Sequence, residues 1–265
     1  MKSSFAHVKI AVLGDIILDE YLYLIPSDSS AEENAPIYLM GRKEHFLGGA
    51  ANVAYNLAQM GVQTTLFGRI ASSKSHTSGI IEELSSNINL SIVRCDVTPT
   101  TVKQRLVFNN SILARIDQEV CEALTPFQTE KTISKLKSFV SLNPDAMLIV
   151  SDYNKGVVNS ELMREVKSLW PKKRILIDPK PRKGMEEIYK DCEFMKPNLK
   201  EAFEILEIKT QEEKNSFDYN SLAQRLIDKF NLNSVCISLG GKGAFAQDRD
   251  GEEILVSPED NIHVF

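Results

Sequence analysis

Short apolar runs bounded by turn residues recur along the chain, and most segments between them carry apolar residues at helical spacing. Such runs are typical of buried strands, whereas the helical spacing indicates helices with one buried face. Strands are predicted at residues 8–13, 63–68, 146–150, 174–177, 194–195 and 234–238, and helices at 52–60, 161–170, 200–206 and 221–230. This alternation predicts an α/β fold with a mainly parallel sheet covered by helices on both faces.

Two segments, 21–46 and 91–117, break the alternation and have the pattern of extended strands with polar turns. We expect them to form a small antiparallel β lid over the edge of the sheet that binds ligands. In open parallel sheets this edge lies beyond the carboxyl ends of the strands. The loops at 15–19, 152–156 and 178–180 each follow a predicted strand, so their polar residues should meet at this edge.

Composition narrows the classes of function. The chain has 265 residues, of which 43% are hydrophobic and 25% charged, which suits one large domain over residues 1–265. Its net charge of −5 argues against general binding to nucleic acid or an anionic membrane, and favours small-molecule ligands. No stretch is long and apolar enough to span a membrane, and the four cysteines lack metal-binding spacing. A cytoplasmic protein is expected.

Gly48 and Gly49 open directly into a predicted helix of small residues. Glycines let a backbone approach a ligand closely, and the free amides at the start of a helix favour polar or anionic groups. Asn52, in the first turn, is then expected to face the same ligand. Taken alone, a glycine pair before a helix is more often ordinary turn chemistry.

Charged residues gather at two further places. Asp15 and Asp19 follow the first predicted strand, where carboxylates accept hydrogen bonds from sugar hydroxyls or cap a turn. Lys103 and Arg105 alternate along one face of a strand, with Arg115 on the predicted return strand. A paired cationic face suits a phosphate ester, and the alternative is a solvated sheet face.

Two motifs nearer the C-terminus suggest a nucleotide. The spacing of Asn198 and Glu201 caps a helix and also suits magnesium waters and phosphate oxygens. Ser238, Gly241 and Gly243 lie in a glycine-rich turn after a strand, a place where backbone amides cradle phosphates. P-loop and dinucleotide-binding spacings are absent, and the histidines form no metal-binding set. P-loop enzymes, dinucleotide oxidoreductases and metal hydrolases therefore have little support.

In this order, the segments GDIILDEY, GGAANVAYNLA, TTVKQR, SDYNKGVV, ILIDPK, KPNLKE and ISLGGKG resemble the ribokinase/PfkB family of carbohydrate kinases. The resemblance is closest to the D-glycero-β-D-manno-heptose-7-phosphate kinase module of bifunctional ADP-heptose synthesis proteins. It implies a ribokinase-like three-layer sandwich with a β lid. It also implies transfer of the γ-phosphoryl group of ATP, with Mg²⁺, to the C1 hydroxyl of the heptose 7-phosphate, toward ADP-heptose and lipopolysaccharide core.

The resemblance also implies roles for individual residues. The sugar is expected to contact Asp19, Gly48, Gly49 and Asn52. The 7-phosphate is expected to contact Lys103, Arg105 and Arg115. The nucleotide is expected to lie against Asn198, Glu201, Ser238, Gly241 and Gly243, with Glu201 reaching Mg²⁺ through water. The lid is expected to close over the site and to offer a surface for a homodimer.

One part of the family pattern is missing. Family members continue into a Gly-Ala-Gly-Asp segment whose aspartate is the catalytic base, and this chain stops at Phe265, where that segment should begin. We therefore expect a kinase domain truncated at its C-terminus, with no catalytic base of its own and little activity. Two alternatives stay open: an inactive remnant that binds sugar phosphate or nucleotide, and a family kinase for another sugar.

Overall fold

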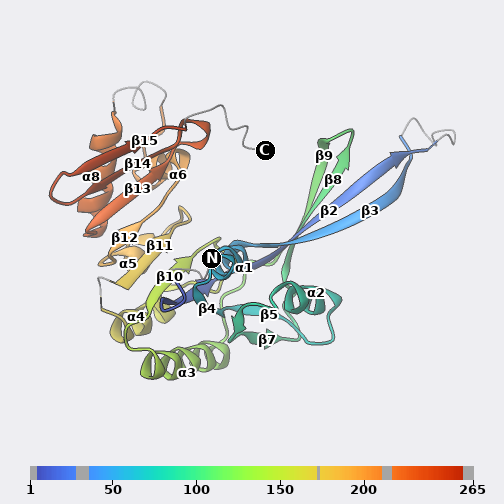
Figure 1. Ribbon diagram of the computed structural model, residues 1–265, viewed down its shortest axis with the longest axis horizontal. Coiled ribbons are helices and arrows are strands. Elements are labelled where there is room, and N and C mark those ends of the chain that lie inside the picture. Colours follow the sequence, from blue (N-terminus) through green and yellow to red (C-terminus); the bar gives the residue numbers. More distant parts are fainter. Residues whose placement is uncertain (1–4, 28–35, 172–173, 211–216, 259–265) are drawn as a thin grey trace.

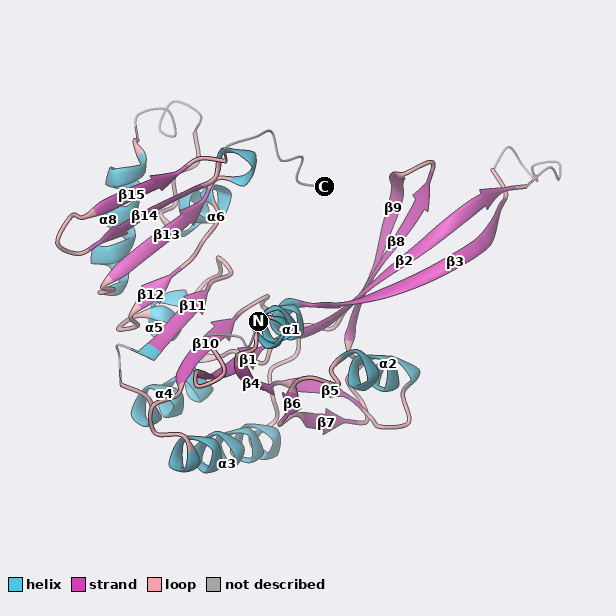
Figure 2. Cartoon of the chain, viewed as in Figure 1, coloured by secondary structure: helices cyan, strands magenta, loops and turns pink. Residues whose placement is uncertain are grey.

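The computed structural model describes residues 5–27, 36–171, 174–210 and 217–258. Residues 28–35 of the expected lid and the chain end at 259–265 lie outside the described residues. Within the described part, a large sheet carries the helices and a smaller sheet projects from it (Figure 1, Figure 2).

The large sheet has nine strands in the order β15-β14-β13-β12-β11-β10-β1-β4-β6. From β6 to β13 every pairing is parallel, whereas β14 and β15 run antiparallel at one edge. The strands are β1 (Lys9–Gly14), β4 (Gln63–Phe67), β6 (Asn89–Leu90), β10 (Met147–Ser151), β11 (Ile175–Asp178), β12 (Phe194–Met195), β13 (Ser234–Ser238), β14 (Ala244–Asp248) and β15 (Glu253–Val256). The predicted α/β fold with a mainly parallel sheet is confirmed.

Helices cover both faces of this sheet. The helices are α1 (Gly49–Gln59), α2 (His76–Leu84), α3 (Pro126–Leu142), α4 (Ser160–Leu169), α5 (Met185–Tyr189), α6 (Leu199–Ile205) and α8 (Tyr219–Phe230). Alternate residues of β1 enter two different cores: Ala11 and Leu13 pack with the core under α3 to α8, and Ile10 and Val12 with that under α1 and α2. This burial on both faces explains the continuous apolar runs in the central strands.

The smaller sheet, which we call the lid, has four strands in the order β3-β2-β8-β9. They are β2 (Ile16–Pro26), β3 (Tyr38–Gly48), β8 (Thr101–Phe108) and β9 (Ser111–Gln118). β2 pairs antiparallel with β3 and parallel with β8, and β8 pairs antiparallel with β9. Figure 1 shows the lid extending away from the large sheet beyond α1.

The lid differs in extent from the two segments that the sequence pattern marked. The first part of the lid begins at Ile16, before the expected start at residue 21. The second part begins at Thr101, after the expected start at residue 91. Within the expected second segment, β7 (Val93–Cys95) pairs instead with β5 (Arg69–Ala71) as a separate two-stranded sheet. None of the helices in the described ranges is long and apolar enough to cross a membrane.

Candidate functional site

Asp15, in the turn between β1 and β2, organises the loop that follows β10. Its buried carboxylate accepts hydrogen bonds from the backbone N–H groups of Tyr153 at 2.9 Å, Lys155 at 3.0 Å and Val157 at 3.1 Å. All three donors belong to one loop, which lies more than a hundred residues after Asp15 in the sequence. Asp15 therefore shapes the site, and the turn-capping interpretation of this residue fits better than sugar binding.

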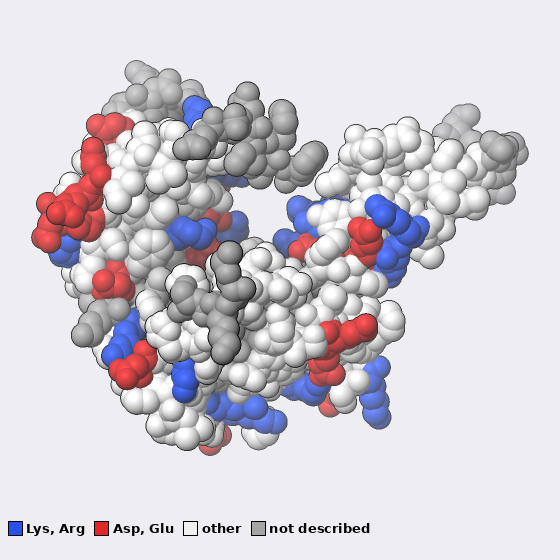
Figure 3. All heavy atoms as spheres, viewed as in Figure 1, with Lys and Arg blue, Asp and Glu red and all other residues white. Residues whose placement is uncertain are grey.

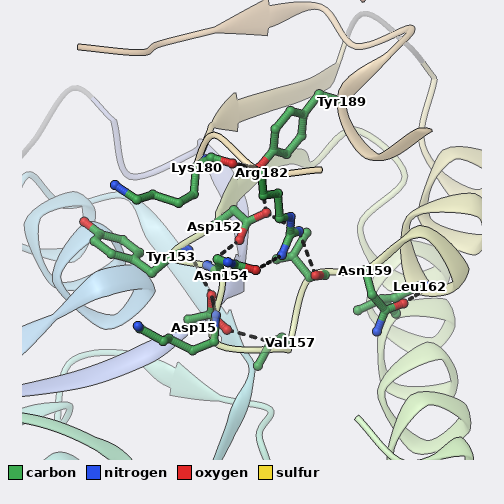
Figure 4. Close-up of polar contacts among 12 residues, drawn as sticks. Asp15, Asp152, Tyr153, Asn154, Val157, Asn159, Leu162, Lys180, Arg182 and Tyr189 are labelled. Atoms are coloured by element: carbon green, nitrogen blue, oxygen red, sulfur yellow. Dashed lines mark hydrogen bonds and ion pairs between the residues drawn. The ribbon is translucent and has the colours of Figure 1, made fainter. Parts of the chain in front are cut away.

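Asp152, at the end of β10, forms a second buried anchor (Figure 4). Arg182 pairs with its carboxylate, the Tyr189 hydroxyl donates to it at 2.7 Å, and the backbone N–H of Asn154 donates at 2.7 Å. Arg182 also donates to the Asn154 side chain at 2.7 Å. Burial raises the pKa of Asp152 to about 6, against the lowering effect of Arg182 and Tyr189. These contacts tie the loop after β10 to the loop after β11.

Asp19, Lys103 and Arg105 come together on the lid. The β2–β8 register pairs Asp19 with Lys103, and Arg105 donates a hydrogen bond to the Asp19 carboxylate at 2.5 Å. The ring of Tyr21 lies beneath the Arg105 guanidinium, 5.1 Å from its carbon atom. Two cations and a carboxylate thus share one small part of the lid near its base.

Arg115 lies next to this group on β9. The β8–β9 register pairs Arg105 with Arg115 and Lys103 with Asp117. Arg115 donates to Asp117 at 2.9 Å, and its side chain is 54% exposed. The structure therefore brings all three predicted phosphate-binding cations together, with Arg115 at the more exposed margin.

Gly48 and Gly49 make room at the junction of β3 and α1. A Cβ at Gly48 would lie 2.4 Å from Oδ2 of Asp19, so only glycine leaves space for that carboxylate. Gly49 has φ +56°, and a Cβ there would lie 2.3 Å from the backbone oxygen of Asp15. The same oxygen accepts the Ala50 N–H at 2.9 Å. The glycine pair therefore supports Asp19 and the start of α1 rather than only clearing a path for a ligand.

Asn52 lies apart from this group in the structure. It is exposed on α1, and its side chain accepts a hydrogen bond from Asn56 at 3.1 Å. It lines a hollow of about 520 Å³ between α1, the end of β3 and the end of α2, with Phe46 and Tyr55 among its neighbours. No hydrogen bond joins Asn52 to Asp19 among the described residues, and its role in sugar binding stays a prediction.

A separate cleft of about 250 Å³ lies at the carboxyl ends of β10 to β13. It is lined by Asp152, Tyr153, Asp178, Pro179, Lys180, Lys196, Asn198, Glu201 and Ser238. Lys180 pairs with Glu201 at 3.3 Å and Lys196 with Asp178 at 3.2 Å. The cleft thus holds two lysines, each paired with a carboxylate. The lysines are suited to phosphate groups, and the carboxylates are suited to a hydrated magnesium ion. Figure 3 shows charged side chains on both walls of the hollow between the lid and these strands.

Asn198 and Glu201 begin α6 with reciprocal hydrogen bonds. Asn198 Oδ1 accepts the Glu201 N–H at 2.8 Å, and Glu201 Oε2 accepts the Asn198 N–H at 3.1 Å. This is the capping box, which satisfies two amides that a helix start leaves open. The other oxygen of Glu201 faces Lys180, so one carboxylate serves both the helix and the cleft.

The glycine-rich turn after β13 meets the cleft only at Ser238. Ser238 forms an isolated parallel bridge with Asn198 and lines the cleft. Gly241 is exposed in the short 3₁₀ turn Gly240–Lys242, with open space where a Cβ would stand. Gly243 has φ +97°, and a Cβ there would lie 1.9 Å from the backbone oxygen of Val256. Gly243 is thus required by the β14–β15 hairpin, and neither glycine lines the cleft.

Sequence reasoning assigned no role to Tyr153 or Lys196, which the structure places in the cleft. Lys196 directly follows β12, and Tyr153 comes two residues after the end of β10. Asp178 ends β11, and Lys180 lies two residues beyond it. Position at a strand's carboxyl end was therefore the available signal. Among the described residues, no group of three or more His, Cys, Asp or Glu side chains is placed to hold a metal ion directly. Asp178 and Glu201 fit a hydrated Mg²⁺ better than a protein cage.

Comparisons with known proteins agree with this arrangement. Residues 8–262 match the pfkB family carbohydrate kinase. The Bifunctional protein HldE of Koribacter versatilis (strain Ellin345) is 28% identical over 253 residues, which cover 94% of this chain and 50% of that protein. The Bifunctional protein HldE of Actinobacillus succinogenes (strain ATCC 55618 / DSM 22257 / CCUG 43843 / 130Z) is 30% identical over 246 residues, covering 91% and 48%. The chain spans about half the length of the curated relatives it matches.

Solved structures share the fold. Phosphofructokinase-2 from Escherichia coli in complex with substrates and products has a TM-score of 0.70 at 17% identity, covering 95% of this chain and 78% of that chain. The same enzyme in complex with fructose-6-phosphate has a TM-score of 0.68 at 17% identity, covering 95% and 80%. At this level of identity the likeness shows the fold alone.

Proposed function

The chain belongs to the pfkB family of carbohydrate kinases, and on that premise we propose that it binds a sugar phosphate together with ATP and Mg²⁺. The motifs and the HldE relatives favour D-glycero-D-manno-heptose 7-phosphate as the sugar. The reaction is transfer of the γ-phosphoryl group to the C1 hydroxyl, which gives the heptose 1,7-bisphosphate used toward ADP-heptose. A kinase for another phosphorylated sugar is the nearest alternative.

The observation that carries the proposal is the grouping of Arg105, Lys103 and Asp19 on the lid. Arg105 is held by Asp19, and Lys103 lies at the paired position of the neighbouring strand. A carboxylate accepts hydrogen bonds from sugar hydroxyls, while adjacent cations favour a phosphate ester. An acceptor that carries both hydroxyls and a phosphate matches this group better than an uncharged sugar does.

The cleft at β10 to β13 is proposed to take the nucleotide phosphates. Lys180 and Lys196 would exchange carboxylate partners for phosphate oxygens, leaving Glu201 and Asp178 to hold the water shell of Mg²⁺. When bound, Mg²⁺ neutralises charge on the phosphates and favours in-line transfer. The loop after β10, held by Asp15 and Asp152, lines this cleft through Tyr153.

A second candidate is a protein that binds both ligands without transferring phosphoryl. It is favoured by the state of the carboxylates in the described residues: Asp19 is paired with Arg105, Asp152 with Arg182, and Asp178 with Lys196. In each of these three groups a carboxylate oxygen is already engaged by a cation and is therefore not open to the proton of an acceptor hydroxyl. These three groups are therefore proposed to position ligands rather than to take the proton of the acceptor hydroxyl.

The test is transfer of a radiolabelled γ-phosphoryl group from ATP to heptose 7-phosphate, with binding of each ligand followed by calorimetry. It is run on the 265-residue chain and on the same chain joined to a relative's Gly-Ala-Gly-Asp segment. Transfer in either form supports the kinase. Binding of both ligands without transfer in either form favours the second candidate. Absence of binding and transfer contradicts both.

We also propose that the lid is the surface for a second copy of the chain. β9 is exposed along its whole length, and Ile112, Leu113 and Ile116 are each about half exposed. A row of apolar side chains on an edge strand is a surface that proteins usually cover. If the chain dimerises through this strand, changing both Ile112 and Ile116 to glutamate should convert the dimer to a monomer in a sedimentation experiment. A dimer that persists in the variant would contradict this surface.

A further inference from the structure

The backbone around Tyr153 is held in place by hydrogen bonds to neighbouring segments. Its backbone N–H donates to Asp15, and the residue before it, Asp152, donates its own N–H to the backbone oxygen of Asp178 at 3.0 Å. The next residue, Asn154, has φ +57° and donates to the Asp152 carboxylate. Two buried carboxylates thus fix the backbone on both sides of Tyr153.

The Tyr153 side chain lies at the proposed nucleotide cleft. Tyr153 lines the cleft with Lys180, Lys196 and Glu201. Figure 4 shows the Tyr153 ring and the Lys180 side chain extending to the same side, away from the network around Asp152. The other tyrosine in this region, Tyr189, is different, because its buried hydroxyl is already bonded to Asp152 and to the backbone of Lys180.

The Tyr153 hydroxyl makes no hydrogen bond to any residue that the structure describes. Burial, followed by the negative charges of Asp178, Glu201 and Asp19, raises the pKa of Tyr153 to about 12. The phenol therefore keeps its proton near neutral pH and is available as a donor. The charges that raise this pKa belong to Asp178 and Glu201 of the cleft and to Asp19 of the lid, so the Tyr153 hydroxyl is within electrostatic reach of both groups.

We propose that Tyr153 is a substrate-contacting residue whose hydroxyl donates a hydrogen bond to a phosphoryl oxygen of the nucleotide in this cleft. The inference rests on the proposed function, since it takes the nucleotide as the ligand of the cleft. A neutral donor is well suited here, because it stabilises an anionic oxygen without adding a charge that would compete with Lys180 and Lys196 for the same carboxylates.

The test is calorimetric titration of the 265-residue protein with ATP and Mg²⁺, and separately with heptose 7-phosphate. Tyr153→Phe removes only the hydroxyl, and Tyr38→Phe is the matched control, since Tyr38 lies against Phe108 on the lid and does not line the cleft. Tyr153→Phe should raise the Kd for ATP roughly 10-fold, the usual effect of one lost hydrogen bond to a charged group. Its Kd for heptose 7-phosphate alone and its melting temperature should stay those of the wild type.

Three results would overturn the inference. The first is an unchanged Kd for ATP in Tyr153→Phe. The second is equal weakening of heptose 7-phosphate alone, which would make Tyr153 a general support for the loop. The third is a wild-type protein that binds no ATP, which would overturn the proposed function as well. A wild-type protein that binds ATP but no heptose 7-phosphate contradicts the proposed acceptor alone, and the comparison of variants with ATP still decides the role of Tyr153.

Discussion

Arg105 of β8 donates a hydrogen bond to Asp19 of β2 across 2.5 Å, and their side chains are 19% and 22% exposed. The pairing fixes the guanidinium while leaving its other N–H groups available. A lysine in its place would carry the charge but lack the planar fork that engages two acceptors at once. Arg105→Lys is expected to weaken binding of heptose 7-phosphate about 10-fold by calorimetry. Equal affinity in Arg105→Lys and the wild type would show that charge alone is enough at this position.

Glu201 offers a way to separate support of a helix from binding in the cleft. Glutamine preserves the capping box, since its side-chain oxygen still accepts the Asn198 N–H, but it removes the negative charge. Glu201→Gln should therefore change the free energy of unfolding by less than ~0.5 kcal/mol while weakening ATP binding in the presence of Mg²⁺. Glu204→Gln, on the exposed side of the same helix, is the control. A Glu201→Gln protein with normal ATP affinity would limit Glu201 to its structural role.

Gly49 should tolerate no side chain, because φ is +56° and a Cβ would lie 2.3 Å from the Asp15 backbone oxygen. Gly49→Ala is expected to lower the free energy of unfolding in urea by at least ~1–3 kcal/mol. The control is Gly79→Ala within α2, where a Cβ meets nothing within 4 Å. Alanine should stabilise that helix by up to ~1 kcal/mol. Equal stability of the two variants would contradict the close contact at Gly49.

Asp152 should make stability depend on pH in the direction opposite to most carboxylates. Burial raises its pKa to about 6 from 3.8, so the folded protein holds this proton more tightly than the unfolded chain does. Its contribution therefore lowers the free energy of unfolding as the pH rises from about 4 to about 6, by roughly 3 kcal/mol at most.

Substitution isolates that contribution. Asp152→Asn should remove this decline when urea unfolding is measured across the same pH range, whereas Asp145→Asn, at an exposed surface aspartate, should keep it. A decline of the same size in Asp152→Asn would mean that another group titrates in this range. The difference between the two variants matters more than either absolute free energy, because Asp152→Asn also leaves Arg182 without its partner.

The features that sequence predicted well are local ones. Asn198 and Glu201 are three residues apart, so a capping box could be read directly, and alternation along β8 placed Lys103 and Arg105 on one face before any partner strand was known. Six of the nine strands of the large sheet, β1, β4 and β10 to β13, were predicted because burial on both faces leaves apolar runs, whereas β6, β14 and β15 were not. Their parallel direction, but not their order in the sheet, followed from the helices between them.

What sequence could not supply is pairing between distant segments. Asp19 lies beside Lys103 because of the register between two parallel strands. Asp15 holds the loop after β10 through a tertiary contact between segments far apart in the sequence. Asn52 fell on the exposed face of α1 because the helix phase is set by packing of Ala50, Ala51 and Ala54. Gly243 was predicted as a ligand contact, and its positive φ and the nearby Val256 oxygen add a requirement of the hairpin that the sequence pattern did not indicate.

The most direct test is a calorimetric comparison of heptose 7-phosphate with unphosphorylated heptose, using the wild type, Lys103→Ala/Arg105→Ala and a matched control. The control, Arg94→Ala/Lys137→Ala, removes the same two residue types from surface ion pairs outside the lid. The wild type and the control should bind the phosphorylated sugar at least ~10-fold more tightly, and the lid variant should lose that preference. A lid variant that keeps the full preference would show that the phosphate binds elsewhere.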